Sequence, residues 1–432
     1  MRFLGLAAGY KFRDVLRHLF AVGNLSDFLE LRRFLYRHYV LENVQRRGRD
    51  EEFMARVGDL TKNGEEARVF LYDNGRTALA RAVRGAMRAK GNVLVEGDGE
   101  RVENGPAGID NGFAEGGKPK VVVNGLTCYA VVQGVVAAGC EPIYADIEAG
   151  NLNFSAEKLA EILAVERDVV AVVVQNNLGN LVEIEEIAEV TKRFGVILIE
   201  DLAHSMGLVH KSGMESGMTG DAVVLSFGKG KAADVCGGGA VILVNEKMCG
   251  DEVDEGYEKT KVRRVDINMV RDKIYPLVGW CVRGWFGLRL AKVGKGILAV
   301  CMKVDLVRKS ADGGVDFGKR MSFWQAKLLM RKLRRREFFL LQPLRRFYLV
   351  REREKVLTEL EKNGFYGPDF WYERPVSPER YYRIVNFPEE KCPVAVKVAE
   401  RIVNLPMNLN VDELSKFEEI IKKYEVKLDN EK

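Results

Sequence analysis

Between residues 66 and 250 the chain alternates short β-branched runs with segments of helical periodicity, and this alternation limits the folds open to it. The β-branched runs are apolar almost throughout, which is typical of strands buried on both faces. Consecutive parallel strands need a crossover connection, for which a helix is the usual solution. We therefore predict an α/β fold with a mostly parallel central sheet and helices on both faces. Strands are predicted at residues 69–72, 120–124, 142–146, 169–175, 196–200, 222–227 and 239–244, and helices at 77–88, 130–138, 156–163 and 183–194.

The segments that flank this region differ from it in pattern. Residues 1–62 place leucine and phenylalanine at helical spacing between basic residues, so we expect a helical arm or cap over residues 1–65. The large domain then covers residues 66–250, and its stretch 97–117, rich in Gly, Asp and Asn, is predicted to be a surface loop. An insertion at 251–315 precedes a small C-terminal α/β domain at 316–432, where we predict a long basic helical region at 320–362, a strand at 383–386 and helices at 393–403 and 412–424.

The insertion combines apolar and aromatic residues with regularly placed cations. Residues 274–304 contain Trp280, Trp285 and Phe286, interrupted by Arg283, Arg289, Lys292 and Lys295. One interpretation is an amphipathic helical segment that contacts a membrane surface, at the inner membrane face. The other is a helical hairpin that packs on its own domain or on a dimer partner. The basic run 331–336 is more typical of a solvated helix face than of a nucleic-acid site.

Composition excludes several classes of protein. The chain has 432 residues, 47% hydrophobic and 30% charged, which suits a large core with a soluble surface. A net charge of +5 gives no support for nucleic-acid binding. The seven cysteines are scattered without CxxC spacing, and only four histidines accompany them, so we expect a reduced, cytoplasmic protein without a metal site. The N-terminus lacks the apolar core of a signal peptide, and no uncharged stretch is long enough to span a membrane.

An acidic pair, Glu200-Asp201, ends the predicted strand 196–200. A carboxylate at the carboxyl end of such a strand points into the crevice where α/β sheets bind ligands. There it can hold a protonated pyridine nitrogen, which would make the ring of pyridoxal 5′-phosphate (PLP) a stronger electron sink. The alternative is that the pair only caps the helix that follows.

A glycine-rich loop with two lysines, Lys229 and Lys231, follows Ser226 at the end of another predicted strand. A lysine in this place can reach a ligand at the sheet edge. Its amine must be partly neutral to attack an aldehyde, and partial burial beside cationic groups lowers the pKa in that direction. The alternative is a solvated loop.

The turn that contains Gly75, Arg76 and Thr77 links the first strand of the large domain to an amphipathic helix. Such a junction offers backbone N–H groups and the positive end of a helix dipole to a phosphate, unless it is an ordinary turn. The turn of Gly75 to Thr77, the acid Asp201 and the lysine Lys231 follow one another along the chain. Each stands at a predicted strand end. Their joint occurrence predicts a PLP site.

Seven segments together resemble the DegT/DnrJ-type (StrS-like) sugar aminotransferases, which are fold type I PLP enzymes. They are NGRTAL, LTCYAVVQGVVAAGCEPIYADI, ILIEDLAHS, LSFGKGK, GGGAVILVN, GKRMSFWQA and CPVAVKVAERIVNLPMN, and the resemblance covers residues 66–425 apart from 251–315. It implies an aspartate aminotransferase-like fold and a PLP-dependent transfer of an amino group from an amino acid to a keto-sugar, usually nucleotide-linked. It also implies cell-surface polysaccharide or secondary-metabolite synthesis, and a homodimer with active sites at the subunit interface.

The resemblance assigns roles to single residues. Lys231 occupies the lysine of the family's Ser-Phe-x-x-x-Lys pattern and would form the Schiff base. Asp201 would pair with the pyridine nitrogen, and His204 would lie near the 3-hydroxyl of the cofactor. The phosphate would be held by Ser226, Gly75, Arg76 and Thr77. Because lysine stands where related dehydratases have histidine, the pattern favours amino transfer, with Lys231, Asp201 and His204 as the catalytic residues.

Three positions depart from the family pattern. Gly237 replaces a glutamate, Gly318 replaces an asparagine of the partner-facing loop, and Cys128 takes the place of the ring-stacking aromatic residue, with Tyr129 next to it as a substitute. Candidates for sugar contact are Trp371, Tyr372 and Arg320, although the first two also suit a domain core. The departures leave two alternatives open: a PLP-dependent dehydratase or lyase, and a non-catalytic PLP-fold scaffold or regulator that uses its insertion to bind a membrane or a partner.

Overall fold

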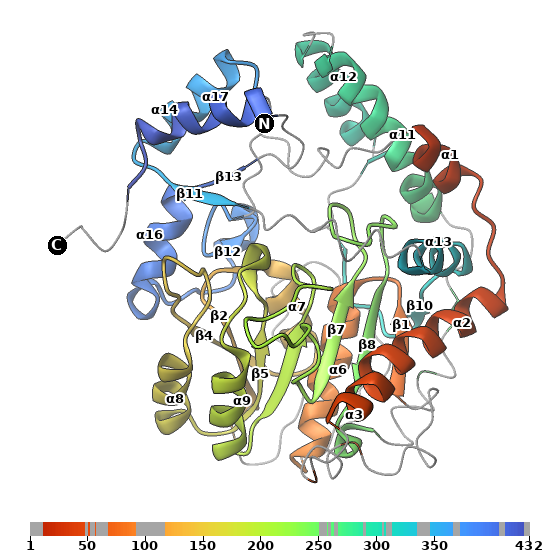
Figure 1. Cartoon of the computed structure of the whole chain (residues 1–432), viewed down its shortest axis with the longest axis vertical. Helices are drawn as coiled ribbons and strands as arrows, with labels where there is room; N and C mark the ends of the chain where they lie inside the picture. The colour runs from red at the N-terminus through yellow and green to blue at the C-terminus, as the bar shows by residue number, and fades with distance from the viewer. Residues whose placement is uncertain are drawn as a thin grey trace.

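A nine-stranded mixed sheet forms the centre of the computed structural model, with the strand order β4-β2-β5-β6-β7-β8-β1-β10-β9 (Figure 1). The structure describes residues 12–47, 51, 57, 68–91, 117–249, 257, 261–262, 267–287, 291–304, 306–307, 313–334, 346–365, 372–405 and 411–426. The strands are β1 (Val69–Tyr72), β2 (Lys120–Asn124), β4 (Glu141–Ala145), β5 (Val169–Val174), β6 (Ile197–Asp201), β7 (Ala222–Ser226), β8 (Gly239–Leu243), β9 (Lys261–Val262) and β10 (Lys319–Arg320).

The predicted strands of residues 66–250 are all present. The strands β4, β2, β5, β6 and β7 run parallel, whereas β8 is antiparallel to both of its neighbours, β7 and β1. The prediction of a mostly parallel central sheet is therefore confirmed. The parallel strands bring their carboxyl ends to one edge of the sheet, which is the edge where such folds bind ligands.

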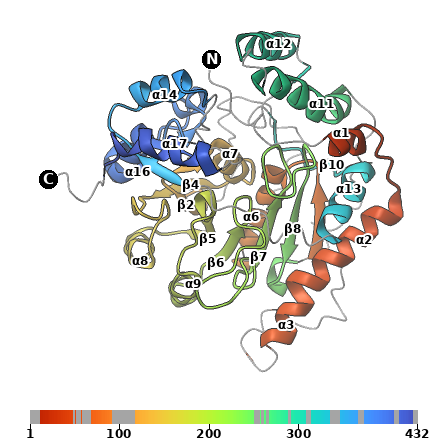
Figure 2. The ribbon, with the colours of Figure 1, turned by 45° about the horizontal axis from the view of Figure 1, so that its top comes forward.

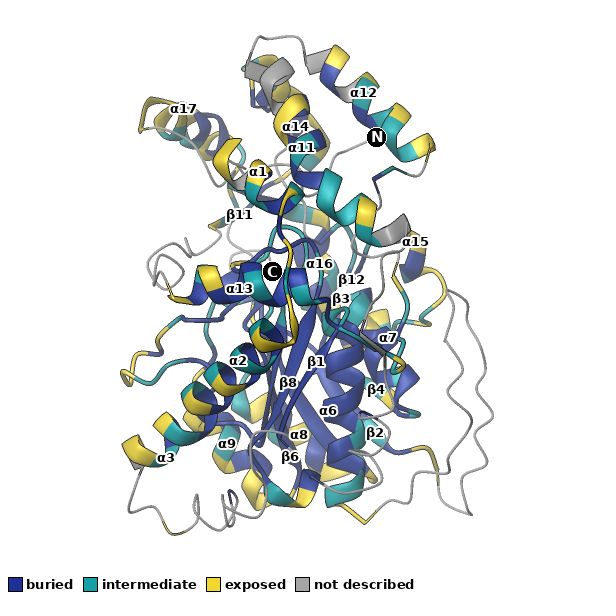
Figure 3. Ribbon diagram, turned by 90° about the vertical axis from the view of Figure 1, so that its right-hand side faces the viewer, coloured by how far each residue is buried: buried dark blue, intermediate teal, exposed yellow. Residues whose placement is uncertain are grey.

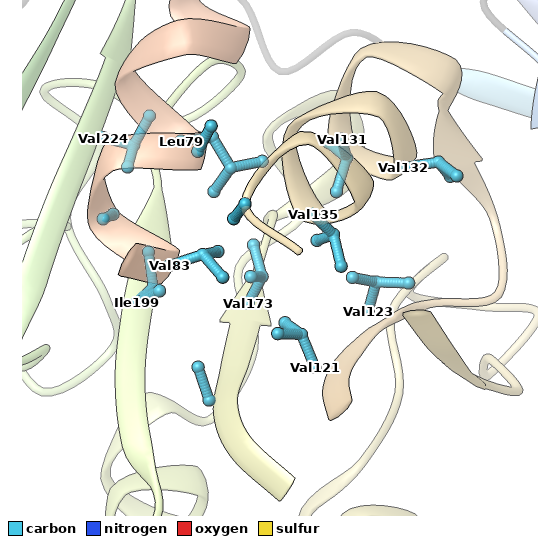
Figure 4. Close-up of a cluster of buried hydrophobic side chains, with 14 of the residues drawn as sticks. Leu79, Val83, Val121, Val123, Val131, Val132, Val135, Val173, Ile199 and Val224 are labelled. Atoms are coloured by element: carbon cyan, nitrogen blue, oxygen red, sulfur yellow. The ribbon is translucent and has the colours of Figure 1, made fainter. Parts of the chain in front are cut away.

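Side chains of successive strand residues enter different cores. Val121, Val123 and Val173 pack with the helices α6 (Gly75–Ala89) and α7 (Tyr129–Ala137), as Figure 4 shows for this cluster. Val122 and Val172 point the other way, into the core beneath α8 (Ala156–Val165) and α9 (Ile184–Arg193). This alternation is the period of two that a strand imposes. Burial of each valine contributes roughly 1.5–3 kcal/mol, so both faces must stay covered by helices.

The N-terminal helices cover the other end of the sheet. They are α1 (Phe12–Leu19), α2 (Leu25–Tyr36), a π-helical turn (Arg37–Leu41) and α3 (Glu42–Arg47), so the prediction of a helical N-terminal segment is confirmed where the structure describes it. Asn24 and Asp27 form a reciprocal capping box at the start of α2. With α13 (Phe323–Arg334), α2 packs over β1, β7 and β8 on the same face of the sheet as α8 and α9.

The small C-terminal domain packs around its own core. Its strands β11 (Phe347–Leu349) and β13 (Ile402–Asn404) pair antiparallel, beside α14 (Arg353–Lys362), α16 (Pro393–Arg401) and α17 (Val411–Lys422) (Figure 2). A short strand, β12 (Val376–Ser377), joins this part of the chain to β3 (Thr127–Cys128), which leads directly into α7. The contact holds the small domain over the carboxyl edge of the large sheet.

Two predictions in the C-terminal region are wrong in detail. A single basic helical region at 320–362 is interrupted, because α13 ends at Arg334 and β11 follows at Phe347. Residues 383–386 form a turn after α15 (Glu379–Tyr382), whereas β13 forms where a helix end was expected. The elements β10 and α13 pack with the large sheet, and the domain boundary at 316 stays a prediction. The residues 335–336 of the basic run and most of the predicted loop 97–117 lie outside the described residues.

The insertion forms a helical hairpin of α11 (Ile267–Gly287) and α12 (Ala291–Lys303). Tyr275, Val278, Val282 and Leu298 make up its small core, and α11 also packs against α1. Among the described residues, no helix combines the length and the apolar character needed to cross a bilayer.

The N-terminal helices are tied to the large domain by a titratable contact. His38 lies between two carboxylates, with Nε2 3.0 Å from Oε1 of Glu215 and Nδ1 3.2 Å from Oε2 of Glu42. Burial opposes the charge on the ring, but the two carboxylates outweigh it and raise the pKa of His38 above 6.5. Only the protonated ring donates from both nitrogens.

The contact predicts how stability depends on pH. Because the folded-state pKa of His38 is raised, its contribution is fully present below pH 6.5 and is lost as the pH rises through the folded-state value. We expect the melting temperature of the wild type to fall over this range more steeply than that of His38→Gln, which cannot be protonated. Thermal melts of both proteins at closely spaced pH values measure the difference, and parallel curves would contradict the prediction.

Candidate active site

The carboxyl ends of β6 and β7 bring the predicted acid and lysine together. Asp201, the last residue of β6, is only 7% exposed, and its Oδ1 accepts a hydrogen bond of 3.0 Å from the N–H of Ala203. Burial raises the pKa of Asp201, while this N–H and the positive charge of Lys231 act to lower it. The carboxylate and the lysine therefore interact electrostatically across the strand ends, as a site built on both requires.

The two acids at the end of β6 play different parts. Glu200 is fully buried on the opposite face of the sheet, where its carboxylate accepts hydrogen bonds from the N–H groups of Gly217, Thr219 and Gly220 at 2.8, 2.9 and 2.6 Å. Glu200 thus holds the loop of residues 217–220 in place. This structural role resembles the alternative in which the acidic pair only caps a helix. Asp201 faces α6 and α7, because consecutive strand residues point to opposite faces. Only Asp201 is placed for ligand chemistry.

The loop that carries Lys231 is shaped by a buried aspartate. Asp234 accepts hydrogen bonds from the N–H of Gly230 at 2.9 Å and from the N–H of Cys236 at 2.7 Å. Gly230 has a φ of +75°, a conformation that glycine adopts without strain. Lys231 stands half-buried in this clamped loop, so the position of its Cα is well defined relative to β7.

The two lysines of the loop have different neighbours. The Nζ of Lys229 lies 3.7 Å from Oδ1 of Asp272 and 4.2 Å from the ring centroid of Tyr275, and both partners belong to α11. Lys231 is instead the cation that acts on Asp201. This arrangement favours Lys231 as the reactive lysine. Sequence reasoning had no partner for Lys229, because α11 lies some forty residues further along the chain.

The start of α6 packs closely against the end of β7, and we call this junction of Gly75 and Ser226 the cup. A Cβ added at Gly75, the first residue of α6, would come within 2.8 Å of the Ser226 Oγ. The side chain of Asn74 caps this helix, accepting from the N–H and the hydroxyl of Thr77 at 2.9 and 3.1 Å. The helix dipole, the first N–H groups of α6 and the Ser226 hydroxyl thus face one small space, which suits a phosphate. Asn74 was not among the predicted site residues, although asparagine before a helix is a common N-cap.

The side chains of Arg76 and Thr77 are engaged in contacts within the protein. The Nη1 of Arg76 donates to Oε1 of Gln133 at 2.8 Å and to the carbonyl of Gly313, and burial lowers the pKa of this guanidinium. The Thr77 hydroxyl accepts from the N–H of Asp316 at 3.1 Å. These bonds tie α6 to α7 and to the segment before β10. A direct phosphate contact from either side chain stays a prediction.

His204 and Tyr129 also lie at this edge. The Nδ1 of His204 accepts from the N–H of Leu178 at 3.2 Å, so a neutral ring carries its proton on Nε2 and can donate it to an oxygen. The ring of Tyr129 stacks on that of Tyr381, with centroids 4.0 Å apart and planes 6° from parallel. Stacking of Tyr129 on a cofactor stays a prediction, and the half-buried Cys128 beside it supplies no ring.

The predicted sugar-contacting residues lie in different surroundings. Tyr372 is buried, and its hydroxyl donates to Oδ1 of Asn177 at 2.7 Å, which matches the core alternative. The Nε of Arg320 donates to the carbonyl of Tyr257 at 3.1 Å. Trp371 lies outside the described residues. Sequence reasoning missed Asn177, whose side chain also donates to the carbonyls of two loops; its only signal was the run of asparagines near residue 177.

The insertion reaches the position where the family pattern has a glutamate. A Cβ at Gly237 would lie 3.6 Å from Oδ2 of Asp272, the same carboxylate that pairs with Lys229. A negative charge is therefore present beside position 237, but it comes from α11. The insertion is part of the wall of the site.

Comparison with known sequences locates the relationship in the centre of the large domain. Residues 109–253 match the DegT/DnrJ/EryC1/StrS aminotransferase family. A UDP-4-amino-4,6-dideoxy-N-acetyl-beta-L-altrosamine transaminase from Campylobacter jejuni is 32% identical over 129 residues, which are 30% of this chain and 34% of that protein. A pleiotropic regulatory protein from Geobacillus stearothermophilus is 29% identical over 146 residues, 34% of this chain and 37% of that protein. The aligned stretch thus spans about a third of the length of these curated relatives.

Solved structures extend the likeness to most of the chain. PseC of Helicobacter pylori, an aminotransferase involved in the biosynthesis of pseudoaminic acid, aligns with a TM-score of 0.53 at 14% identity, covering 82% of this chain and 86% of that one. A DegT DnrJ EryC1 StrS aminotransferase from Brucella abortus aligns with a TM-score of 0.51 at 16% identity, covering 90% and 96%. The prediction of the fold type I architecture is confirmed. The segment that matches the DegT/DnrJ/EryC1/StrS aminotransferase family, residues 109–253, includes Asp201, Ser226 and Lys231.

Proposed function

We propose that this protein is a PLP-dependent aminotransferase that moves an amino group from an amino acid to a nucleotide-linked keto-sugar. The observation that carries the proposal is the position of the buried Asp201 and of Ser226 at neighbouring strand ends, with Gly75 against Ser226 and the Lys231 loop directly after β7. Asp201, Ser226 and Lys231 lie in the segment that matches the family. The names of several curated relatives, transaminases and synthases of amino sugars, support the substrate class.

The residues present fit PLP. When bound, PLP supplies an aldehyde that condenses with amines and a ring that withdraws electrons from the adjoining carbon. The carboxylate of Asp201 would hold the protonated ring nitrogen, and the cup of Gly75 and Ser226 would take the phosphate. The Nε2–H group of His204 would donate a hydrogen bond to the 3-hydroxyl oxygen attached to the ring.

Lys231 would do most of the protein's chemical work. Its Nζ would hold the cofactor covalently. As a free amine at the carboxyl edge of the sheet, Lys231 would remove a proton from Cα of the donor and return one on the sugar side. The clamp from Asp234 keeps the loop in place during these transfers.

The proposal is tested by loading the purified chain with PLP and adding amino acids one at a time. Glutamate or another donor should convert the aldehyde form to the amine form, which is visible in the absorption spectrum. A nucleotide-linked keto-sugar should then restore the aldehyde form. If no amino acid produces the change, the protein is a dehydratase, a lyase or a non-catalytic regulator instead.

We also propose that the protein forms a homodimer in the cytoplasm, as the resemblance implies; light scattering after size exclusion measures the mass. No disulfide links the cysteines of the described residues, which suits a reducing compartment.

The cup predicts the effect of one added methyl group. In Gly75→Ala, the new Cβ would meet the Ser226 Oγ at 2.8 Å and fill space meant for the phosphate. We expect PLP affinity at least about tenfold weaker, a loss of roughly 1.4 kcal/mol or more. Gly150→Ala is the matched control, because a Cβ there meets no atom within 4 Å. Equilibrium titration with PLP checks both variants, and equal affinities would contradict the cup.

A further inference from the structure

The outer face of the insertion hairpin carries an exposed apolar stripe. On α12, Val293 and Val300 are 43% and 61% exposed, and Val304 just beyond the helix is 64% exposed. Their spacing places them on one side of the helix, whereas Leu298 on another side is buried against α11. Figure 3 shows α11 and α12 at the upper end of the molecule, with exposed residues on their outer surface.

An exposed aromatic pair lies on the two neighbouring helices. Phe12 of α1 and Trp280 of α11 are 53% and 41% exposed, and their ring centroids are 5.3 Å apart. Tryptophan is favoured where one side of a ring meets an apolar phase and the other meets water. We call the surface formed by Phe12, Trp280, Val293, Val300 and Val304 the hairpin face.

The chain segment of the hairpin is basic. Residues 273–304 contain six basic residues, Lys273, Arg283, Arg289, Lys292, Lys295 and Lys303, and no Asp or Glu, which gives a net charge of +6. Asp272 precedes the stretch and Asp305 follows it, so residues 272–305 together still carry +4.

We propose that the hairpin face docks on the surface of an anionic phospholipid membrane. Exposed valines and an aromatic pair would enter the headgroup region, and the Lys and Arg residues of this segment would be attracted to the anionic surface. A second copy of this chain is a poorer occupant, because a two-fold contact through this face would oppose two stretches of +6. The inference goes beyond amino transfer and holds for any activity of the site.

The position of α11 connects the docking surface with the active site. The same helix that presents Trp280 outwards contacts Lys229 through Asp272 and Tyr275. The loop of Lys231 thus lies directly behind the hairpin face. Docking would bring the site close to the lipid surface and to substrates held there.

The test is sedimentation of the full chain with vesicles. We expect binding to vesicles of phosphatidylcholine with phosphatidylglycerol, weakened by salt, and little binding to phosphatidylcholine alone. The double variant Val300→Asp, Val304→Asp should bind at least about tenfold more weakly, since it removes apolar contact and adds negative charge. The matched control, Val165→Asp with Val411→Asp, changes two valines that are 74% and 82% exposed elsewhere, and should bind as the wild type does.

Several outcomes would overturn the proposal. They are a wild type that stays in the supernatant with anionic vesicles, equal binding to neutral vesicles, and equal loss of binding in the control variant. Thermal melts verify that both variants are folded, and light scattering measures their masses. If the hairpin variant dissociates an oligomer while vesicle binding is absent in the wild type, the face joins two copies of the chain and the membrane proposal is wrong.

Discussion

Lys231→Ala is expected to abolish covalent attachment of PLP and to lower kcat by about 10²–10⁴-fold or more, because the variant loses both the anchor and the proton carrier. Borohydride reduction followed by peptide mapping reports the attachment, and single-turnover kinetics reports the rate. In the wild type the label should appear on Lys231. Asp201 should remain in place in the variant, since its hydrogen bond to Ala203 does not involve the lysine.

The neighbouring lysine provides the control for this experiment. Lys229→Ala removes an ion pair with Asp272 at 3.7 Å and the contact with the ring of Tyr275, but leaves Lys231 beside Asp201. We expect covalent attachment to persist and kcat to stay within about tenfold of the wild type, because Lys229 contacts Asp272 and Tyr275 of α11 and not the predicted cofactor residues. A label on Lys229, or an unchanged rate in Lys231→Ala, would refute the assignment.

Substitution of Glu200 should lower stability, whereas substitution of its neighbour Asp201 should lower activity. Glu200→Ala would leave three backbone N–H groups of residues 217–220 without their acceptor in a buried place. At about 1–3 kcal/mol for each unsatisfied donor, we expect the free energy of unfolding to fall by roughly 3 kcal/mol or more. Any Glu200→Ala protein that folds should retain its PLP site, because Asp201 faces the other side of the sheet.

Asp201→Asn should show the opposite pattern. Burial raises the pKa of Asp201, which means that the folded protein opposes its charge, so a neutral amide of the same shape should cost little stability. An amide no longer holds the ring nitrogen in its protonated form, and we expect kcat to fall by about 10²–10³-fold, the size of effect seen when an electrostatic partner is removed. Urea unfolding and steady-state kinetics on both variants measure the contrast. A larger stability loss in Asp201→Asn than in Glu200→Ala would contradict it.

The strands and the core of the site were predictable because they depend on local patterns. Apolar β-branched runs identify buried strands, and parallel strands bring their carboxyl ends to one edge. Asp201 and Lys231 therefore had to lie near each other once each was placed at a strand end. The C-terminal region was predicted less well, because a basic helical pattern continues past Arg334 although the chain next forms β11. Short strands such as β13 depend on a pairing partner, Phe347–Leu349, that lies more than fifty residues earlier.

The sequence by itself determined the sheet and placed the acid, the serine and the lysine at strand ends. Only the tertiary structure decided which side chains are committed to other partners. Arg76 bonds to Gln133 and Gly313, and Lys229 pairs with Asp272, across separations that no local pattern reports. The same folding places α11 beside the lysine loop while its outer face remains exposed. The physical reason is that hydrogen bonds and ion pairs depend on distance in space, whereas periodicity constrains only which face a residue takes on its own helix or strand.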